Sequence, residues 1–528
     1  MRRKKYLKIL TVIVSLVLLI ILLMILFVEP GVRKKIEETL NEKTNKYIFN
    51  IKKVHILPIQ SGIKIDGITI FSKQEHGGNP DLSGEIASVK FKRIKILKAL
   101  FKKDIVIGEV TISNIRVEGK MPFHEQGKQP AILPLNIHIS KTLIEKTDLS
   151  VKNTISSESY LMKEGRFKVY DLNLIKHDTL SKDIIKQFDF EAQELAAVMA
   201  DSMYTYTLRD IACSSTSNTL SADSFSIHPN YTDYEFTSRH KFQTVRIEAV
   251  FSNIYLHDFN PADYLASGSL ISSYVEIRTM DMKVFRDKRK EFRHVNRPVF
   301  QDMIYNYPGI IRFDSIGLSN GNVTYKVHGE EANEPGSISF NEIKAGIYKI
   351  TNDPIYKTEK DYLVLKANAL LMGKSRLTVL LKGRIFESNN TFTLDGTLSE
   401  LEANELNPIL ENNAFVYITS GKIDGMNFSF TANNDKATGS MTLLYHGLDI
   451  AVKNKQSDDT TAFREKFISF IANKIVLDSN PVSGDGVRLG IIDYERDPER
   501  FLFGYCFKSI LSGISSSIVK SPKKRKNS

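Results

Sequence analysis

The chain has 528 residues and a formal net charge of +11, from 72 Lys and Arg against 61 Asp and Glu. Each of two tails, residues 1–8 and 520–528, holds five basic and no acidic residues, so the chain between them is close to neutral. A nucleic-acid-binding protein needs a basic face on its folded body, and this balance excludes that class. An apolar content of 42% excludes a disordered chain. With only two cysteines, Cys213 and Cys506, a disulfide scaffold and a cysteine-based metal cluster are also excluded.

Residues 9–28 contain no charged side chain. At ~1.5 Å per residue, a helix of that length spans the ~30 Å hydrocarbon core of a bilayer. A cleaved signal peptide has a shorter apolar region, of about 7–15 residues, and ends in small residues. This run ends instead in Phe27, Val28, Glu29 and Pro30. The pattern predicts an uncleaved transmembrane anchor over residues 9–28.

The charges around the anchor bear on its orientation. The basic tail, residues 1–8, favours a cytoplasmic N-terminus, while Arg33, Lys34 and Lys35 follow the anchor closely and weaken this bias. Large domains translocate largely regardless of such charges, so we expect the bulk of the chain to lie outside the cytoplasm.

A short amphipathic helix is predicted directly after the anchor. Pro30 suits the first turn of a helix, and Val32, Ile36 and Leu40 follow at helical spacing. We expect this helix to lie on the membrane surface or against the first strands of the fold.

From Tyr47 onward the apolar period changes to two, which is typical of strands with one buried face. Residues 63–70 alternate apolar and polar side chains with a slip of one residue at Gly67, and residues 105–117 slip before Ile115. A glycine in an alternating strand indicates a β-bulge, which bends the strand and restores the apolar face. Residues 189–200 are ambiguous between helix and strand.

This strand pattern runs from about residue 47 to residue 454, and no linker marks a domain boundary. It implies a sheet with one apolar and one wet face, which a sandwich, a barrel or a curled groove could bury. A string of β-sandwiches has the higher general prior. A membrane anchor favours the groove, because a tethered apolar channel has a clear use, but the pattern leaves the three architectures open.

After residue 454 the apolar residues recur at helical spacing, and Asp497 followed by Pro498 predicts the start of a helix. Two interpretations are equally open. The helix closes the end of the sheet, or it lies on a membrane surface with basic residues facing the headgroups. The membrane-surface candidates are Phe503, Phe507, Ile510, Ile514, Lys523 and Lys524.

Motifs for catalysis and for cofactors are missing from the sequence. The eleven histidines include no pair at i, i+4, and no G-x-S-x-G elbow, Walker loop or calcium loop occurs. Lone histidines such as His138 and His446 more often form ordinary hydrogen bonds within a sheet than bind a metal. We predict no catalytic residue, no metal site and no cofactor, and therefore no enzyme.

Several segments resemble a known protein family. These segments are residues 94–100, 392–398, 406–408, 420–425 and 439–445, and they follow one another in the order found in that family. Together with the strand patterns that surround the first of them, they are similar to the N-terminal region and the C-terminal module of the AsmA-like envelope proteins of Gram-negative bacteria. Three further segments resemble the version found in Bacteroidota: residues 287–289, 313–325 and 507–514.

This resemblance implies a long β-groove that is open on one side, anchored in the bacterial inner membrane by a single pass, with the bulk of the chain in the periplasm. It implies phospholipid transfer between membranes, or outer-membrane lipid homeostasis, without catalysis. The implied partners are phospholipids, the inner membrane and, at the far end, the outer membrane or an envelope protein, with no nucleic acid. The alternative function is a structural or assembly factor for outer-membrane proteins.

The fold class predicted from the pattern and the resemblance together is mainly β. An N-terminal transmembrane helix precedes an elongated, curled antiparallel β-sheet groove with short terminal helices. The predicted segments are a cytoplasmic tail at 1–8, the anchor at 9–28, an AsmA-like N-terminal region at 30–125, a middle groove at 126–390, an AsmA-like C-terminal module at 391–454, a helical region at 455–519 and a basic tail at 520–528.

A groove of this kind would shield acyl chains from water, at ~0.8 kcal/mol per buried methylene. The polar positions Lys64 and Lys422 are expected to face away from it, and a charge at Met426 is expected to block conduction without unfolding the protein. The lipid-groove candidates are Ile63, Ile65, Ile68, Ile70, Ile112, Ile115, Val117, Ile423, Met426, Phe428 and Phe430.

Overall fold

Hydrogen bonds place the 21 described strands in one mixed sheet that does not close on itself. The prediction of a mainly β protein is therefore confirmed. None of the helices that the structure describes is long and apolar enough to cross a membrane, and the predicted anchor, apart from Val28, lies outside the described residues. The computed structural model describes residues 28–44, 47–73, 81–95, 104–121, 136–174, 187–357, 362–452, 476–482 and 486–519.

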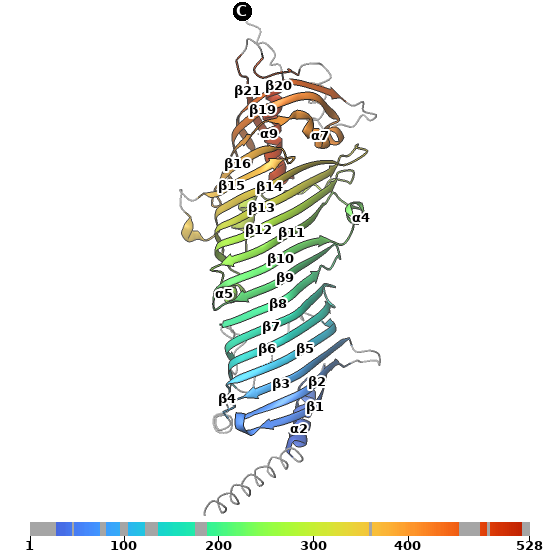
Figure 1. Cartoon of the computed structure of the whole chain (residues 1–528), viewed down its shortest axis with the longest axis vertical. Coiled ribbons are helices and arrows are strands. Elements are labelled where there is room, and N and C mark those ends of the chain that lie inside the picture. The colour runs from blue at the N-terminus through green and yellow to red at the C-terminus, as the bar shows by residue number, and fades with distance from the viewer. Residues whose placement is uncertain are drawn as a thin grey trace, which may run out of the picture. The chain divides into compact units, whose positions relative to one another are not determined.

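Two compact units make up the chain, and each is described by itself. Unit 1 comprises residues 1–223 and 260–262, and unit 2 comprises residues 224–259 and 263–528. The elements of unit 1 are labelled in Figure 1: α2 (Glu29–Lys43), β1 (Tyr47–Leu57), β2 (Gly62–Ser72), β3 (Leu82–Lys92), β4 (Asp104–Ile107), β5 (Glu109–Met121), β6 (Asn136–Asn153), β7 (Ser159–Leu174), β8 (Gln187–Val198) and β9 (Tyr204–Ser214). Strand β10 (Thr219–Pro229) begins in unit 1 and ends in unit 2.

The strands of unit 1 pair mostly in antiparallel fashion, in the order β1, β2, β3, β5, β6, β7, β8 and β9. Strand β6, however, runs parallel to both β4 and β5, so the prediction of a purely antiparallel sheet is wrong there. Parallel neighbours need a connection of about a dozen residues or more. Residues 122–135, between β5 and β6, are long enough to provide one.

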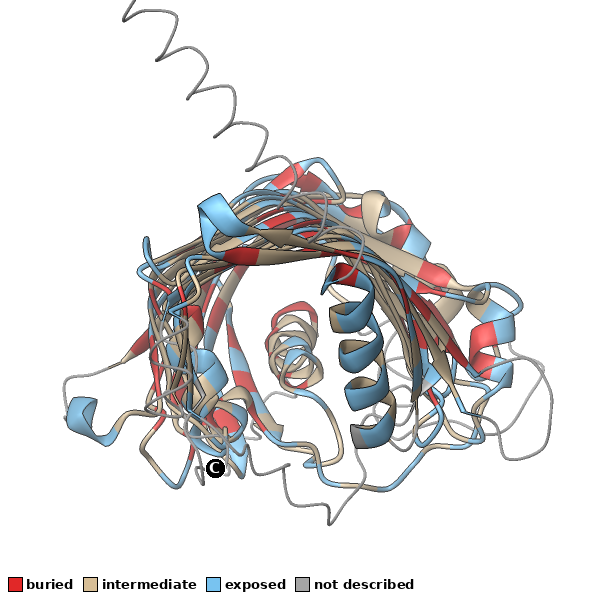
Figure 2. Ribbon diagram, turned by 90° about the horizontal axis from the view of Figure 1, so that it is seen from below, coloured by how far each residue is buried: buried red, intermediate tan, exposed pale blue. Residues whose placement is uncertain are grey.

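Strands of unit 1 contain irregular steps where one residue adopts a left-handed backbone conformation. Gly67 has a φ of 67° and Asn114 a φ of 52°, and neither takes part in the strand pairing. Glycine and asparagine tolerate this conformation better than other residues. Across the step at Gly67, Ile65 and Ile68 both enter the same buried cluster although they are three positions apart. The irregular positions predicted at Gly67 and before Ile115 are confirmed, but they are not the predicted β-bulges, because the pairing skips one residue on each strand and its register does not shift. Figure 2 shows strands that are bent along their length.

Helix α2 covers the apolar side of the first strands of unit 1. Val32, Ile36 and Leu40 pack against a buried cluster that includes Ile51 and Val54 of β1. The predicted amphipathic helix and its apolar positions are therefore confirmed, with the helix beginning at Glu29.

Polar side chains of α2 also satisfy the free edge of β1. The backbone N–H of Ile56 donates to Glu29 over 2.8 Å, and that of Phe49 donates to Asn41 over 2.7 Å. An exposed strand edge is a template for pairing with another chain. These hydrogen bonds occupy backbone N–H groups at the edge of β1, so α2 covers this edge of the sheet.

Eleven of the described strands begin in unit 2, which also has helices at its connections and at its C-terminal end. Its strands are β11 (Val245–His257), β12 (Leu270–Asp287), β13 (Ile311–His328), β14 (Gly336–Thr351), β15 (Leu363–Leu371), β16 (Ser375–Gly383), β17 (Phe392–Leu398), β18 (Leu401–Glu402), β19 (Val416–Ala432), β20 (Lys436–Val452) and β21 (Leu489–Glu495). Its helices of six or more residues are α4 (Asp233–Ser238), α6 (Phe300–Tyr305), α7 (Asn407–Ala414) and α9 (Leu502–Ile518), while α5 (Pro261–Ser267) starts in unit 1.

Strands β12 and β13 are the parallel pair of unit 2, and the connection between them contains α6. The other described strand pairs of unit 2, from β11–β12 to β20–β21, are antiparallel. Strand β21 lies in the region predicted to be helical. It was missed because its outer side chains, Leu489 and Ile491, are apolar and hide the alternation with the buried Ile492.

Helix α9 confirms the predicted C-terminal helix, although it begins at Leu502 and not at Asp497. Asp497 instead pairs with Arg500, at 3.1 Å. The helix approaches β21 closely through small residues, because a Cβ atom added to Gly490 would lie 2.4 Å from the carbonyl oxygen of Gly513.

Serines of α9 satisfy the free edge of β21. The backbone N–H of Ile491 donates to Ser516 over 2.8 Å, and that of Asp493 donates to Ser512 over 3.3 Å. Helix α9 therefore closes the end of unit 2, which is the first of the two interpretations of the C-terminal helix.

Candidate functional site

Apolar side chains form continuous rows across the strands of unit 1. In the longest row, each residue pairs with the next on the neighbouring strand: Val54, Ile65, Val89, Ile112, Ile144, Phe167, Phe190 and Cys213. Paired residues of neighbouring strands have their side chains on the same side of a sheet. This row therefore lies on one face, with one residue from each of β1 to β9 except β4.

Three further rows lie beside the longest one, and we call the surface formed by all four the apolar face of unit 1. They are Ile51, Ile68, Ile86, Ile115 and Thr147; Phe49, Ile70, Gly84, Val117, Leu149, Met162, Leu195 and Leu208; and Ile56, Ile63, Phe91, Val110, Thr142, Val169 and Phe188. The structure thus brings together the seven groove candidates predicted for this part of the chain: Ile63, Ile65, Ile68, Ile70, Ile112, Ile115 and Val117.

The opposite face of unit 1 is mainly polar. Next to the longest apolar row, the paired residues on this face are His55, Lys64, Lys90, Thr111, Leu143, Lys168, Asp189 and Ser214. Lys64 therefore faces away from its neighbour Ile65, as the alternation predicts.

Helix α2 covers only one end of the apolar face. Ile144, Phe167 and Phe190 are half-buried, and the rings of the two phenylalanines are 4.7 Å apart. Among the described helices, none packs extensively against β6, β7, β8 or β9. The apolar side chains of these strands are therefore accessible to a ligand within the part of the chain that the structure describes.

Two hydroxyl groups interrupt the apolar face at β6. The Oγ1 atoms of Thr142 and Thr147 are buried, and neither has a hydrogen-bond partner among the described residues. Buried polar atoms normally have a partner.

Cys213 lies at the β9 end of the longest row. Burial, followed by the negative charge of Asp189, raises the pKa of its thiol to about 11. Because the thiolate is the reactive form, we expect iodoacetamide at pH 8 to alkylate Cys213 at least tenfold more slowly than an unperturbed thiol, whose pKa is about 8.5. The rate should rise as the pH approaches 11.

Peptide-resolved mass spectrometry of the full chain measures this alkylation. A Thr216→Cys variant provides the reference rate, because Thr216 is exposed in the turn directly after β9. Equal rates at positions 213 and 216 would contradict the placement of Cys213 on the apolar face.

Unit 2 has a corresponding row, which ends in a closed core. Its successive partners are Leu256, Val275, Ile316, Ile347, Leu365, Leu381, Leu394, Phe430, Gly439 and Ile492. Phe430 is 2% exposed and Ile492 is 1% exposed, in a cluster that includes Tyr505 of α9. This end of the row is therefore sealed by α9.

The groove candidates of unit 2 belong to this closed core. Met426, Phe428 and Phe430 are buried members of the cluster, and Ile423 packs against it. Phe428 and Phe430 also stack, with ring centroids 6.4 Å apart. These side chains stabilise the fold and do not line an open surface, so the expectation that a charge at Met426 leaves the protein folded needs correction.

The membrane-surface candidates separate into two groups on α9. Phe503 and Phe507 are 61% and 41% exposed, with stacked rings 6.5 Å apart. Ile510 and Ile514 instead pack against the core of unit 2. The remaining two candidates lie outside the described residues: Lys523 and Lys524.

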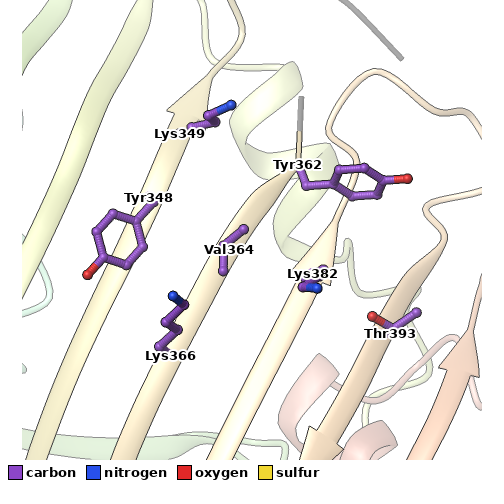
Figure 3. Close-up of a pocket in the computed structure, with 7 residues that line it drawn as sticks. All are labelled: Tyr348, Lys349, Tyr362, Val364, Lys366, Lys382 and Thr393. Carbon is purple, nitrogen blue, oxygen red and sulfur yellow. The ribbon is translucent and has the colours of Figure 1, made fainter. Parts of the chain in front are cut away.

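A shallow pocket of about 620 Å³ lies on the other face of unit 2 (Figure 3). Its lining residues are Tyr348, Lys349, Tyr362, Val364, Lys366, Lys382 and Thr393. The strand neighbours of Tyr348 and Val364, namely Ile347 and Leu365, point into the core. The lining contains no carboxylate, histidine or thiol, so the pocket lacks the acid and base groups that hydrolytic sites commonly pair.

Metal-ligand clusters are also missing from the described residues, where no three His, Cys, Asp or Glu side chains could hold an ion together. The lone histidines make ordinary contacts. His138 hydrogen-bonds to Asn173 over 2.6 Å, and His446 contacts Asp424 over 2.8 Å.

The most accessible half of the apolar face, which includes Ile144, Phe167 and Phe190, was not among the residues predicted from the sequence. The alternation is present in β6 and β7, but polar residues such as Thr142 and Thr147 interrupt it. Ile144 and Thr147 are three positions apart, like Ile112 and Ile115 on β5. This spacing could have indicated that the apolar face continues onto β6.

Comparisons with known proteins add no assignment to this geometry. A scan of the chain against protein-family models finds no match, and neither does a search of curated proteins, so the resemblance to AsmA-like proteins rests on the motifs described above.

Proposed function

We propose that the apolar face of unit 1 binds the acyl chains of phospholipids, and that the protein transfers phospholipids between membranes or maintains outer-membrane lipid homeostasis without catalysis. The observation that carries this proposal is the unbroken row from Val54 to Cys213, which α2 covers only at its first strands. A large accessible apolar surface commonly marks a binding site.

Energetics favour a chain-like apolar ligand on this surface. Each methylene moved from water onto an apolar surface gains about 0.8 kcal/mol. Strands lie ~4.8 Å apart, so the eight strands of the row span roughly 34 Å. An acyl chain could shift from one strand to the next along this row without leaving its apolar contacts.

The proposed location rests on the predicted anchor at residues 9–28. The predicted anchor at 9–28 directly precedes α2, which packs on the first strands of the apolar face. A single pass through the inner membrane would hold this end of the face beside the bilayer, with the bulk of the chain in the periplasm. The partners are then the lipids of the inner membrane and, at the other end of the route, the outer membrane or an envelope protein.

Photocrosslinking tests the proposal. We expect p-benzoylphenylalanine at Phe167 or Phe190, in the full chain in native membranes, to capture phospholipid, because both side chains lie on the accessible part of the apolar face. The matched control is Lys168, which neighbours Phe167 in sequence but lies on the opposite face. Lipid-specific mass spectrometry of the crosslinked peptides measures capture.

Equal lipid capture at Phe167 and Lys168 would contradict the proposal, because the two positions differ only in the face that they occupy. Capture of protein in place of lipid at Phe167 and Phe190 would favour the alternative of an assembly factor for outer-membrane proteins.

A further inference from the structure

Four cationic side chains of unit 2 interact electrostatically. Arg286 is near the end of β12 and Lys288 follows that strand, while Arg500 precedes α9 and Lys508 lies on it. The charges of Arg286, Arg500 and Lys508 all act on Lys288. We call these four residues the cationic cluster.

The cationic cluster adjoins an apolar line on β12. Met280, Met282 and Val284 alternate along the strand and share one face with Arg286. The next partners of Val284 are Tyr325 and then Ile338, which packs on the apolar core of unit 2. The guanidinium therefore stands at the end of an apolar surface.

The dimensions of this line suit an amphiphile. Arg286 lies six positions after Met280, which corresponds to roughly 20 Å along a strand. One leaflet of a bilayer has a hydrocarbon depth of about 15 Å, half of the ~30 Å core. An acyl chain could therefore lie along β12 with its headgroup at Arg286.

Gln243 holds the Arg286 guanidinium in place. Its amide nitrogen donates to the carbonyl oxygens of Lys288 and Lys290, over 3.0 and 2.9 Å. Its amide oxygen is thereby directed at Arg286, which donates to it over 2.8 Å. The Nε–H of Arg286 is buried and has no hydrogen-bond partner among the described residues.

An aromatic ring supports two members of the cluster. The guanidinium carbon of Arg500 lies 4.1 Å from the centre of the Phe292 ring, and that of Arg286 lies 6.0 Å from it. Arginine stacks favourably on aromatic faces. Phe292 therefore helps to hold two like charges in one region.

Arg286 and Lys288 form no ion pair among the described residues, because nearby carboxylates pair with other cations. Asp287 is engaged by Arg289 through two contacts of 2.9 and 2.8 Å. Asp497 lies 3.1 Å from Arg500. Arg286 and Lys288 consequently carry positive charge that no directly paired carboxylate balances among the described residues.

Burial makes this charge costly. Desolvation, reinforced by Arg286, Lys508 and Arg500 and opposed by Glu330, lowers the pKa of Lys288 to about 8. Burial also lowers the pKa of Arg286. A buried cation without a counter-ion destabilises a fold, and an anion that binds there relieves this cost.

We infer that the cationic cluster binds the phosphate group of an anionic phospholipid whose acyl chain lies along Met280, Met282 and Val284. This inference rests on the proposed lipid-binding function and names the chemistry of the ligand within unit 2. A guanidinium with a free Nε–H, beside ammonium groups, matches the geometry and charge of a phosphate.

The test titrates the full chain, in a neutral detergent, with short-chain phosphatidylglycerol or with inorganic phosphate, and measures binding by calorimetry. Arg286→Gln and Lys288→Gln are each expected to weaken phosphatidylglycerol binding about tenfold or more. Lys326→Gln is the matched control, because Lys326 is exposed on the neighbouring strand β13, on the opposite face from Tyr325. It is expected to bind like the unmodified protein.

Thermal melting separates a ligand site from a structural role. Because buried cations without counter-ions destabilise the fold, Lys288→Gln should leave the melting temperature of the ligand-free protein unchanged or higher. A lower melting temperature with unchanged lipid affinity would overturn the inference, as would equal loss of affinity in Lys326→Gln. Inorganic phosphate that binds as tightly as phosphatidylglycerol would overturn the assignment to a lipid.

The inference and the proposed function can fail separately. Lipid capture at Phe190 of unit 1 in the Arg286→Gln background reports on the proposed function alone. Unchanged capture there, with phosphatidylglycerol affinity also unchanged, would reject the headgroup site and leave the apolar face of unit 1 as the lipid site.

Discussion

A Phe190→Asp substitution is expected to reduce lipid transfer between vesicles at least about tenfold while the protein remains folded. Phe190 is half-buried on the apolar face of unit 1, between Phe167 and Cys213. A charge placed against acyl chains costs several kcal/mol, and ~1.4 kcal/mol already corresponds to a factor of ten. Because Phe190 lies partly open, the new carboxylate can keep its hydration when no lipid is bound.

The measurement uses fluorescent phospholipid in donor vesicles and the full chain reconstituted beside acceptor vesicles. Lys168→Asp is the control, since it also introduces a carboxylate, on the neighbouring strand β7 and on the opposite face of the sheet. It should retain the original transfer rate. Equal rates for Phe190→Asp and the unmodified protein, with both proteins folded by circular dichroism, would contradict transfer along this face.

Met426→Glu is expected to unfold unit 2 rather than to block a conduit. Met426 is 8% exposed and its strand partners, Leu398 and Leu443, are buried in the same cluster. Loss of the apolar side chain from a core costs about 2–5 kcal/mol, and burial of a carboxylate adds to this cost. The sum approaches the total stability of a typical domain, about 5–15 kcal/mol.

Urea denaturation followed by circular dichroism measures the loss. Met426→Leu should cost less than about 1.5 kcal/mol, because the volume of the core is kept. Asn427→Glu places the same carboxylate one residue further on, where the side chain is exposed, and should change stability by no more than about 0.5 kcal/mol. A Met426→Glu protein as stable as Asn427→Glu would contradict the closed core beneath α9.

Periodicity predicted which residues share a face but not what covers that face. The alternation at Ile65 and Ile68 and that at Met426 and Phe428 look alike in sequence. In unit 1 the apolar face continues beyond α2 to Phe190, whereas in unit 2 α9 seals the end of the row. Whether a helix packs on a strand depends on contacts between distant segments, and the period of the strand carries no information about them.

The steps in the strands could be predicted because their chemistry is local. Gly67 and Asn114 adopt left-handed conformations that these residue types tolerate. Asp210 of β9 has the same conformation, with a φ of 46°, between Leu208 and Ile211 on the apolar face. A spacing of three between apolar residues, with Gly, Asn or Asp between them, therefore predicts where a strand bends.

The direction of individual strands and the cationic cluster were beyond prediction from the sequence. Parallel pairing of β6 with β5 depends on how the chain returns between them, which alternation does not encode. Arg286 and Lys508 belong to segments that are remote in sequence, yet the charges of both act on Lys288 in the folded unit. In contrast, the existence of α2 and its apolar stripe were predicted, because the helical spacing of Val32, Ile36 and Leu40 and the place of Pro30 in the first turn are local signals, while its packing against β1 was left open.

Native mass spectrometry of the full chain, purified from membranes in a mild neutral detergent, tests most directly whether the accessible apolar row of unit 1 holds lipid. Phospholipid adducts are expected on the unmodified protein and on Lys168→Asp, with clearly fewer of them on Phe190→Asp. Adducts that are equally abundant on all three proteins, or missing from all three, would contradict this expectation.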